Sequence, residues 1–211
     1  MIVESRYNHI FWTPCIVHNL NMILEEIEAN TKWIKEVTGQ AREIIKFITD
    51  YHQSQAIYQE YSKLELLKVA ETQYASNFIM LCCLVDVKNA LMSMVVGPTW
   101  AEWRHANSKG SMVRRVLVDE DWWSKIDFLL KFMSPAFDLL QDADTEKPFL
   151  REVYDGMDTM VEKTVEIITQ EAPTLLFVDF DFSESCRFCH RVEWLQQSIA
   201  HFGTCSESKI L

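Results

Sequence analysis

The stretch His9–Ile27 reads HIFWTPCIVHNLNMILEEI, and it decides how the chain begins to fold. Thr13 can cap a helix through its hydroxyl, and Pro14 suits the first helical position because its missing N–H costs nothing there. The aromatic and β-branched run at 10–12 predicts a buried strand that leads into this helix. Apolar residues then recur at helical spacing, which predicts an amphipathic helix; they are Val17, Leu20, Leu24 and Ile27.

Cys15 and His18 lie one turn apart on the predicted helix, so they share a face. One interpretation makes them metal ligands, but a tetrahedral site needs further ligands that the sequence does not place nearby. The favoured interpretation is a buried thiol and a hydrogen-bonded histidine that pack the helix onto a sheet. Cysteine is among the residue types most often buried, and this favours the second interpretation.

The rest of the chain has mainly helical periodicity. Apolar spacing predicts helices over about 31–50, 56–61, 76–96, 99–104, 119–140 and 148–168. The helix over 76–96 is hydrophobic on most sides, so we expect it at the centre of a bundle, ending at Gly97. Gly39 weakens its helix, and Pro135 should kink the long helix. With a further strand predicted over 175–182, the fold class is mainly α, a helical bundle.

Composition excludes several classes of protein. The 211 residues are 48% hydrophobic and include only five Gly and five Pro, which argues against a β-sandwich or a disordered chain. The net charge of −11 opposes non-specific binding of nucleic acid by the chain as a whole, although it permits a local basic patch. We expect no signal peptide and no membrane partner, because Asp86 and Lys88 interrupt the longest apolar stretch. Six cysteines without a secretory signal then indicate reduced thiols in the cytosol or nucleus.

One segment concentrates positive charge. Residues 104–115 read RHANSKGSMVRR and contain no acid. Their cations are Arg104, Lys109, Arg114 and Arg115. They are suited to contact phosphates, and a solvated loop is an equally open interpretation.

Catalytic motifs are missing from the sequence. There is no Gly-rich phosphate loop, no nucleophile elbow and no HExxH, and the carboxylates mostly fall on outward helix faces. From residue chemistry alone, the chain is not a self-sufficient enzyme.

The C-terminal tail holds a C-x-x-C-H pattern over 186–190. This pattern attaches haem in exported proteins, and we expect no export signal here. A zinc site is the second interpretation, and chance occurrence in a tail is the third. The zinc ligands would be Cys186, Cys189, His201 and Cys205.

The opening stretch resembles a segment of plant hAT-type transposases that reads roughly FW-x-x-C-x-x-H-x-L-N-L. Trp12, Cys15 and His18 fall on this pattern, and Met22 stands where Leu is usual. Further on, EVTGQAREIIKFI resembles the family's next helix, and ETQYAS resembles its T-R-aromatic motif. WWSKIDFLLKFMSPAFDLLQDADTEKPFLREVYDGM resembles the stretch ending in P-x-x-x-L-L-x-x-x-D-x-x-x-P. The resemblance runs from about residue 7 to about residue 170, in the family's order.

The resemblance implies an RNase H-like core interrupted by a helical insertion, with an acidic triad that cuts and joins DNA using divalent metal. The family's two aspartates lie upstream of the Cys/His helix, and its glutamate lies downstream of the insertion. We therefore expect a partial core strand and helix over 1–30, the helical insertion over 31–172 and a divergent tail over 173–211. The triad would be missing, with no catalytic residue and no cofactor of the chain's own.

The motif ETQYAS departs from the family at one position, since Gln73 stands where the family has Arg. Its aromatic residue is Tyr74, and the resemblance makes this residue a stacking platform for a base flipped out near the cut. The alternative is a core tyrosine at the start of the central helix. The missing arginine removes a cationic donor beside the platform.

These observations predict a transposase-derived nuclear fragment that is catalytically incomplete. Residual DNA binding would use the helical insertion, through Tyr74, Arg104, Lys109, Arg114 and Arg115. One alternative is a module that binds another protein or a second copy of itself, which seven Trp and nine Met would permit. Another is a zinc-stabilised binding tail. We also expect the first helix to be poorly packed relative to 64–168, because its apolar stripe would lack the rest of its sheet.

Overall fold

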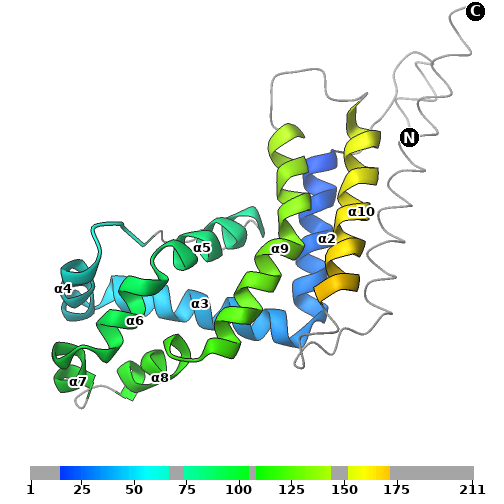
Figure 1. Cartoon of the computed structure of the whole chain (residues 1–211). Helices are drawn as coiled ribbons and strands as arrows, with labels where there is room; N and C mark the ends of the chain where they lie inside the picture. The colour runs from blue at the N-terminus through cyan, green and yellow to red at the C-terminus, as the bar shows by residue number, and fades with distance from the viewer. Residues whose placement is uncertain (1–14, 67–73, 105–107, 144–151, 172–211) are drawn as a thin grey trace, which may run out of the picture. The chain divides into compact units, whose positions relative to one another are not determined.

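A computed structural model describes residues 15–66, 74–104, 108–143 and 152–171 (Figure 1). These described residues form nine helices and no strand, so the protein is a mainly α helical bundle, as predicted. Several predicted features lie outside the described residues. They are the strands at 10–12 and 175–182, the helix cap Thr13, and Pro148, the first residue of the helix predicted over 148–168. The helices are α2 (Ile16–Asn30), α3 (Lys32–Asp50), α4 (His52–Tyr61), α5 (Tyr74–Asp86), α6 (Lys88–Val96), α7 (Pro98–Arg104), α8 (Ser108–Leu117), α9 (Glu120–Ala143) and α10 (Glu152–Glu171).

The chain divides into two compact units. One comprises Glu28–Ser134, and the other combines Met1–Ile27 with Pro135–Leu211. The divisions fall inside α2 and α9, so each of these helices contributes residues to both units. The predicted domains 1–30, 31–172 and 173–211 stay a prediction.

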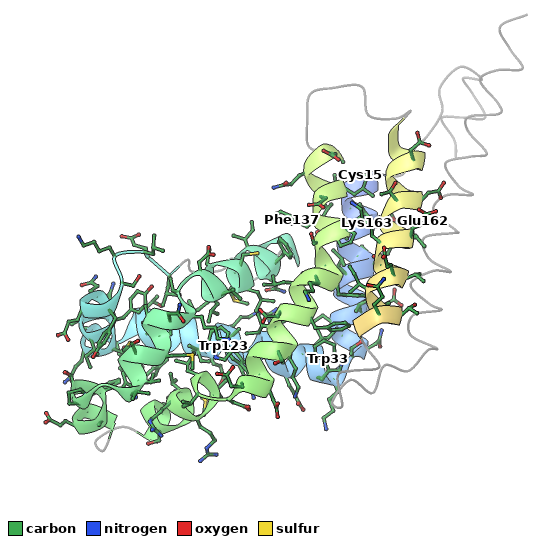
Figure 2. All side chains as sticks on the ribbon, in the orientation of Figure 1. Cys15, Trp33, Trp123, Phe137, Glu162 and Lys163 are labelled. Atoms are coloured by element: carbon green, nitrogen blue, oxygen red, sulfur yellow. The ribbon has the colours of Figure 1, made fainter. Side chains whose placement is uncertain are left out.

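The core of the unit Glu28–Ser134 contains the apolar face of α3, whose spacing the sequence predicts. The buried residues of this face are Ile34, Val37, Ala41, Ile44, Ile45 and Ile48. Tryptophans add large apolar surfaces to the same core. Trp100 of α7 and Trp123 of α9 are fully buried. The indole N–H of Trp123, which Figure 2 labels, donates to the Leu117 carbonyl at 2.9 Å. This hydrogen bond satisfies the polar end of a buried ring.

The predicted helix over 76–96 is broken, which corrects the expectation of one central helix. Val87 leaves the helical conformation, with φ −102° and ψ 7°, and α5 and α6 meet there at a bend of 60°. The bend lets both short helices bury their apolar side chains in one core. Leu81 and Leu84 before the bend and Leu91 and Met94 after it are fully buried.

No single described helix is long and apolar enough to cross a membrane. Segments Ser76–Asp86 and Lys88–Val96 reach the length and apolar composition of a membrane span only together, as a pair bent by 60°.

Helix starts follow local chemistry in two cases. The Asp119 carboxylate accepts a hydrogen bond from the Asp121 N–H at 3.0 Å and so caps α9, close to the predicted start of the helix over 119–140. The helix predicted over 99–104 begins one residue earlier, because α7 starts at Pro98. A proline suits that first position because its missing N–H would have no helical partner.

The second unit contains α2 up to Ile27, α9 from Pro135 onward and α10, which lie alongside one another (Figure 1). Leu20 and Leu24 of α2 are only 1% and 3% exposed. The expectation that this helix is poorly packed is therefore wrong for its central residues. Helices α9 and α10 supply buried apolar residues to the same unit, which the expectation of a missing sheet did not foresee. These residues are Ala136, Leu139, Leu140, Met157 and Met160.

Candidate functional site

Helix α8 gathers three of the predicted DNA-binding residues. Its ten residues carry Lys109, Arg114 and Arg115 and no acid. Lys109 and Arg115 are exposed, whereas Arg114 is half-buried. Residues 108–115 are therefore helical, and the solvated-loop interpretation is wrong for them. Arg104 ends α7, and its side chain lies outside the described part of the structure.

A pocket of about 400 Å³ lies between α3 and α8. Its lining residues are Glu43, Lys46, Phe47, Asp50, Tyr51, Lys109, Met112 and Val113. Phe47 and Val113 are buried and form an apolar base, whereas Tyr51 is 43% exposed. The charged residues of the lining are two lysines and two acids. The pocket therefore combines an aromatic surface with charges of both signs.

The aromatic side of this pocket is held by further rings. The ring centroid of Phe47 lies 4.9 Å from that of Tyr51 and 5.5 Å from that of Trp103. Trp103 in turn meets the buried Trp100 edge-on, at 5.1 Å between centroids. Tilted and edge-on ring pairs at these separations are favourable. They fix Tyr51 at the mouth of the pocket rather than leaving it as an isolated surface ring.

Sequence reasoning missed Lys46 and Tyr51 as site residues. Periodicity identified the buried face of α3, but it did not indicate which helix would lie beside Lys46 and Tyr51. Tyr51 falls between α3 and α4, in a segment expected to be a loop. The usable signal was an aromatic residue at a helix end, five positions after a lysine.

A polar network joins α2, α3 and α5 within the unit Glu28–Ser134. The Glu28 carboxylate accepts hydrogen bonds from Thr38 Oγ1 at 2.7 Å, from Arg42 at 2.8 Å and from Asn77 Nδ2 at 3.1 Å. Arg42 Nε also donates to Asn77 Oδ1 at 3.2 Å, which closes the network. Asn77 is only three residues after Tyr74, so the network anchors the first turn of α5. The side chain of Tyr74 is not described, and both interpretations of that residue stay predictions.

Cys15 and His18 are both exposed (Figure 2 labels Cys15), so the interpretation as a buried thiol and a packed histidine is wrong. At about 100° per residue, His18 points about 160° around the helix from Leu20, which faces the core. Within the described part of the chain, no group of three or more His, Cys, Asp or Glu could hold a metal ion. The proposed zinc ligands at 186–205 lie outside that part.

Two neighbouring thiols lie on α5. Burial raises the pKa of Cys82, and the adjacent Cys83 and Asp86 raise it further. Burial also raises the pKa of Cys83, again with a contribution from Asp86. Both thiols are therefore held in the neutral form, which is the less nucleophilic one.

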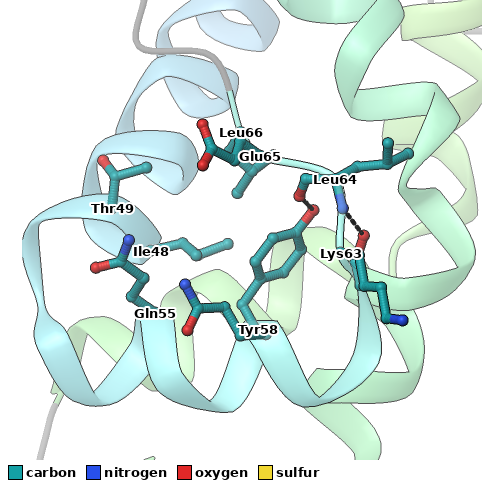
Figure 3. Close-up of a pocket in the computed structure, with 10 residues that line it drawn as sticks. Ile48, Thr49, Gln55, Tyr58, Lys63, Leu64, Glu65 and Leu66 are labelled. Atoms are coloured by element: carbon teal, nitrogen blue, oxygen red, sulfur yellow. Dashed lines mark hydrogen bonds between the residues drawn. The ribbon is translucent and has the colours of Figure 1, made fainter.

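A second pocket, of about 720 Å³, lies beside the end of α3, α4 and the segment after it (Figure 3). The Tyr58 hydroxyl donates to the Leu64 carbonyl at 2.8 Å, and the Leu64 N–H donates to Ser62 Oγ at 3.1 Å. The polar side chains that line this pocket are mostly uncharged, and its charged residues are Lys63 and Glu65. The arrangement shows no acid–base pair within hydrogen-bond distance.

Comparison with family models gives a match over the N-terminal part of the chain. A family model described as a domain of unknown function (DUF659) matches residues 1–44. That span includes Trp12, Cys15 and His18, on which the transposase resemblance depends. Searches of curated proteins and of solved structures each gave no match.

Proposed function

We propose that the chain is a transposase-derived helical protein that binds DNA and does not cut it by itself. The family model that matches residues 1–44 is associated with hAT-like transposase regions, which agrees with the resemblance of the opening stretch. By that resemblance, the chain combines part of an RNase H-like core with the family's helical insertion. We also propose that the protein is nuclear, because the resemblance is to transposases that act on DNA.

Helix α8 is the observation that supports DNA binding best. Three cations on ten residues, without an acid, give α8 a cationic surface on a chain whose net charge is −11, although Glu43 and Asp50 of α3 line the same pocket as Lys109. Such a surface attracts phosphates, because it can replace the counterions condensed on DNA. The contacts we propose are with the phosphate backbone, so binding would show little sequence preference.

Cutting DNA would need the family's metal-binding carboxylates, and the resemblance assigns none of them to a residue of this sequence. We therefore propose no catalytic residue and no cofactor. The chain would occupy DNA without breaking it.

Charge reversal on α8 tests the proposal. Changing Arg114 and Arg115 to Glu should weaken binding of a labelled duplex at least tenfold at low salt, because two phosphate contacts become repulsive. The matched comparison is Arg115→Glu alone against Lys163→Glu, which changes the net charge by the same amount at an exposed residue of α10 in the other compact unit (Figure 2). Equal weakening in the control would show a general charge effect and would contradict a site on α8.

The protein-interaction alternative has less support. Three of the five tryptophans in the described residues are buried, and Trp33 and Trp103 are half-buried. These side chains therefore mainly fill the core rather than an open apolar face. An apparent molecular mass that rises with protein concentration, in a protein that does not bind DNA, would still favour that alternative.

A further inference from the structure

We propose that the pocket between α3 and α8 binds one unpaired base of single-stranded DNA. This inference rests on the proposed function and adds the form of DNA that the protein prefers. It assigns a role to Tyr51 and Lys46, which no sequence motif identifies.

The size and surface of the pocket suit a planar heterocycle. A volume of about 400 Å³ is within the usual range for small-ligand sites. Phe47 and Val113 provide a dry base, and the half-exposed ring of Tyr51 offers a face for stacking. Every base has such a π-face, so stacking on a fixed aromatic ring is a general way to hold an unpaired strand.

Cations are placed so that a strand could run past the pocket along α8. Lys46 and Lys109 belong to its lining, one from each helix. Arg115 lies three residues after the lining residue Met112, so it shares that edge of α8 and is exposed. The phosphates on either side of an inserted base would therefore meet positive charge.

The acids of the lining decide which part of a nucleotide enters. Glu43 and Asp50 line the same pocket and are exposed, as the two lysines are, and a phosphate beside either acid would be repelled. Carboxylate oxygens instead accept hydrogen bonds from the amino groups of a base. The acids of the lining therefore suit the amino groups of a base, and the lysines suit the phosphates on either side of it.

The test compares a single strand with a duplex of the same sequence, using the full chain. The single strand carries 2-aminopurine, whose fluorescence is quenched on stacking. Tyr51→Ala should weaken single-strand binding about tenfold and remove the quenching, with duplex binding unchanged. Tyr51→Phe should keep both. Ser54 Oγ and the Gln55 N–H donate to the backbone carbonyl of Tyr51 and not to its side chain, so the Ala variant retains these contacts.

The outcomes separate this inference from the proposed function. If Tyr51→Ala leaves both the quenching and the affinity unchanged while Arg114 and Arg115 still matter, the pocket proposal is wrong and DNA binding by α8 stands. If neither strand form binds at low salt, both proposals fail. Lys46→Glu is a second variant at an exposed position, and it should weaken single-strand binding more than duplex binding even if Tyr51→Ala does not fold.

Discussion

The guanidinium of Arg42 lies 2.8 Å from the Glu28 carboxylate, and this pair joins the end of α2 to α3. Glu28 is only 13% exposed, and it also accepts hydrogen bonds from Thr38 and Asn77. A carboxylate at this depth needs several donors, because water no longer solvates it fully. The pair therefore links three helices through one charged group.

Removing the arginine should destabilise the protein. Arg42→Met keeps most of the aliphatic stem but deprives Glu28 and Asn77 of their charged partner, and we expect a loss of about 1–2 kcal/mol in the free energy of unfolding. Urea unfolding measures it. The matched control is Lys32→Met, because Lys32 and Glu36 are largely exposed and 3.8 Å apart. That variant should lose less than about 0.5 kcal/mol, and an equal loss in both would contradict the network's importance.

Two glycines inside helices should respond differently to alanine. A Cβ on Gly39 would meet no atom within 4 Å, so Gly39→Ala should raise the free energy of unfolding by up to about 1 kcal/mol through helix propensity. A Cβ on Gly156 would lie 2.7 Å from Cδ1 of the buried Leu139. Gly156→Ala should therefore give no gain or a loss, because Leu139 must move. Equal gains in thermal unfolding experiments would show that α9 and α10 are not closely packed there.

The neighbouring thiols of α5 should react slowly with alkylating agents near neutral pH. Burial raises the pKa of Cys82 and Cys83 in the folded chain, so their thiolates form at higher pH than in the unfolded chain. The stability that neutral thiols contribute is present below their ordinary pKa and is lost as pH rises through the raised values. Mass spectrometry after iodoacetamide treatment should give a higher midpoint pH for the folded chain. A midpoint at or below that of the urea-unfolded chain would overturn this expectation.

Incubation with Mg²⁺ or Mn²⁺ and supercoiled plasmid should leave the plasmid intact, since we propose no catalytic carboxylates. A full-length transposase of the family provides the positive control for cleavage. Metal-dependent nicking that copurifies with the chain would show an active site that the proposal does not contain.

Periodicity predicted the helices well because burial of one face leaves a repeating pattern, as in Ile34, Val37 and Ala41 of α3. It failed at Val87, because an apolar pattern on most sides of a helix continues unchanged through a bend. It also failed for the partners of Leu20 and Leu24, since long-range packing leaves no local signal. The pocket residues Lys46 and Tyr51 were missed for that reason as well. Their partners on α8 are about sixty residues away in the sequence, and only the fold brings them together.

The central claim is that α8 binds the phosphate backbone of DNA, and the salt dependence of binding tests it most directly. Fluorescence anisotropy with a labelled duplex should give a plot of log Kobs against log salt with a slope of about −2 to −3, because two or three cations displace counterions. Arg114→Gln and Arg115→Gln should each reduce that slope by about one. No binding at low salt, or a slope that these substitutions leave unchanged, would contradict the claim.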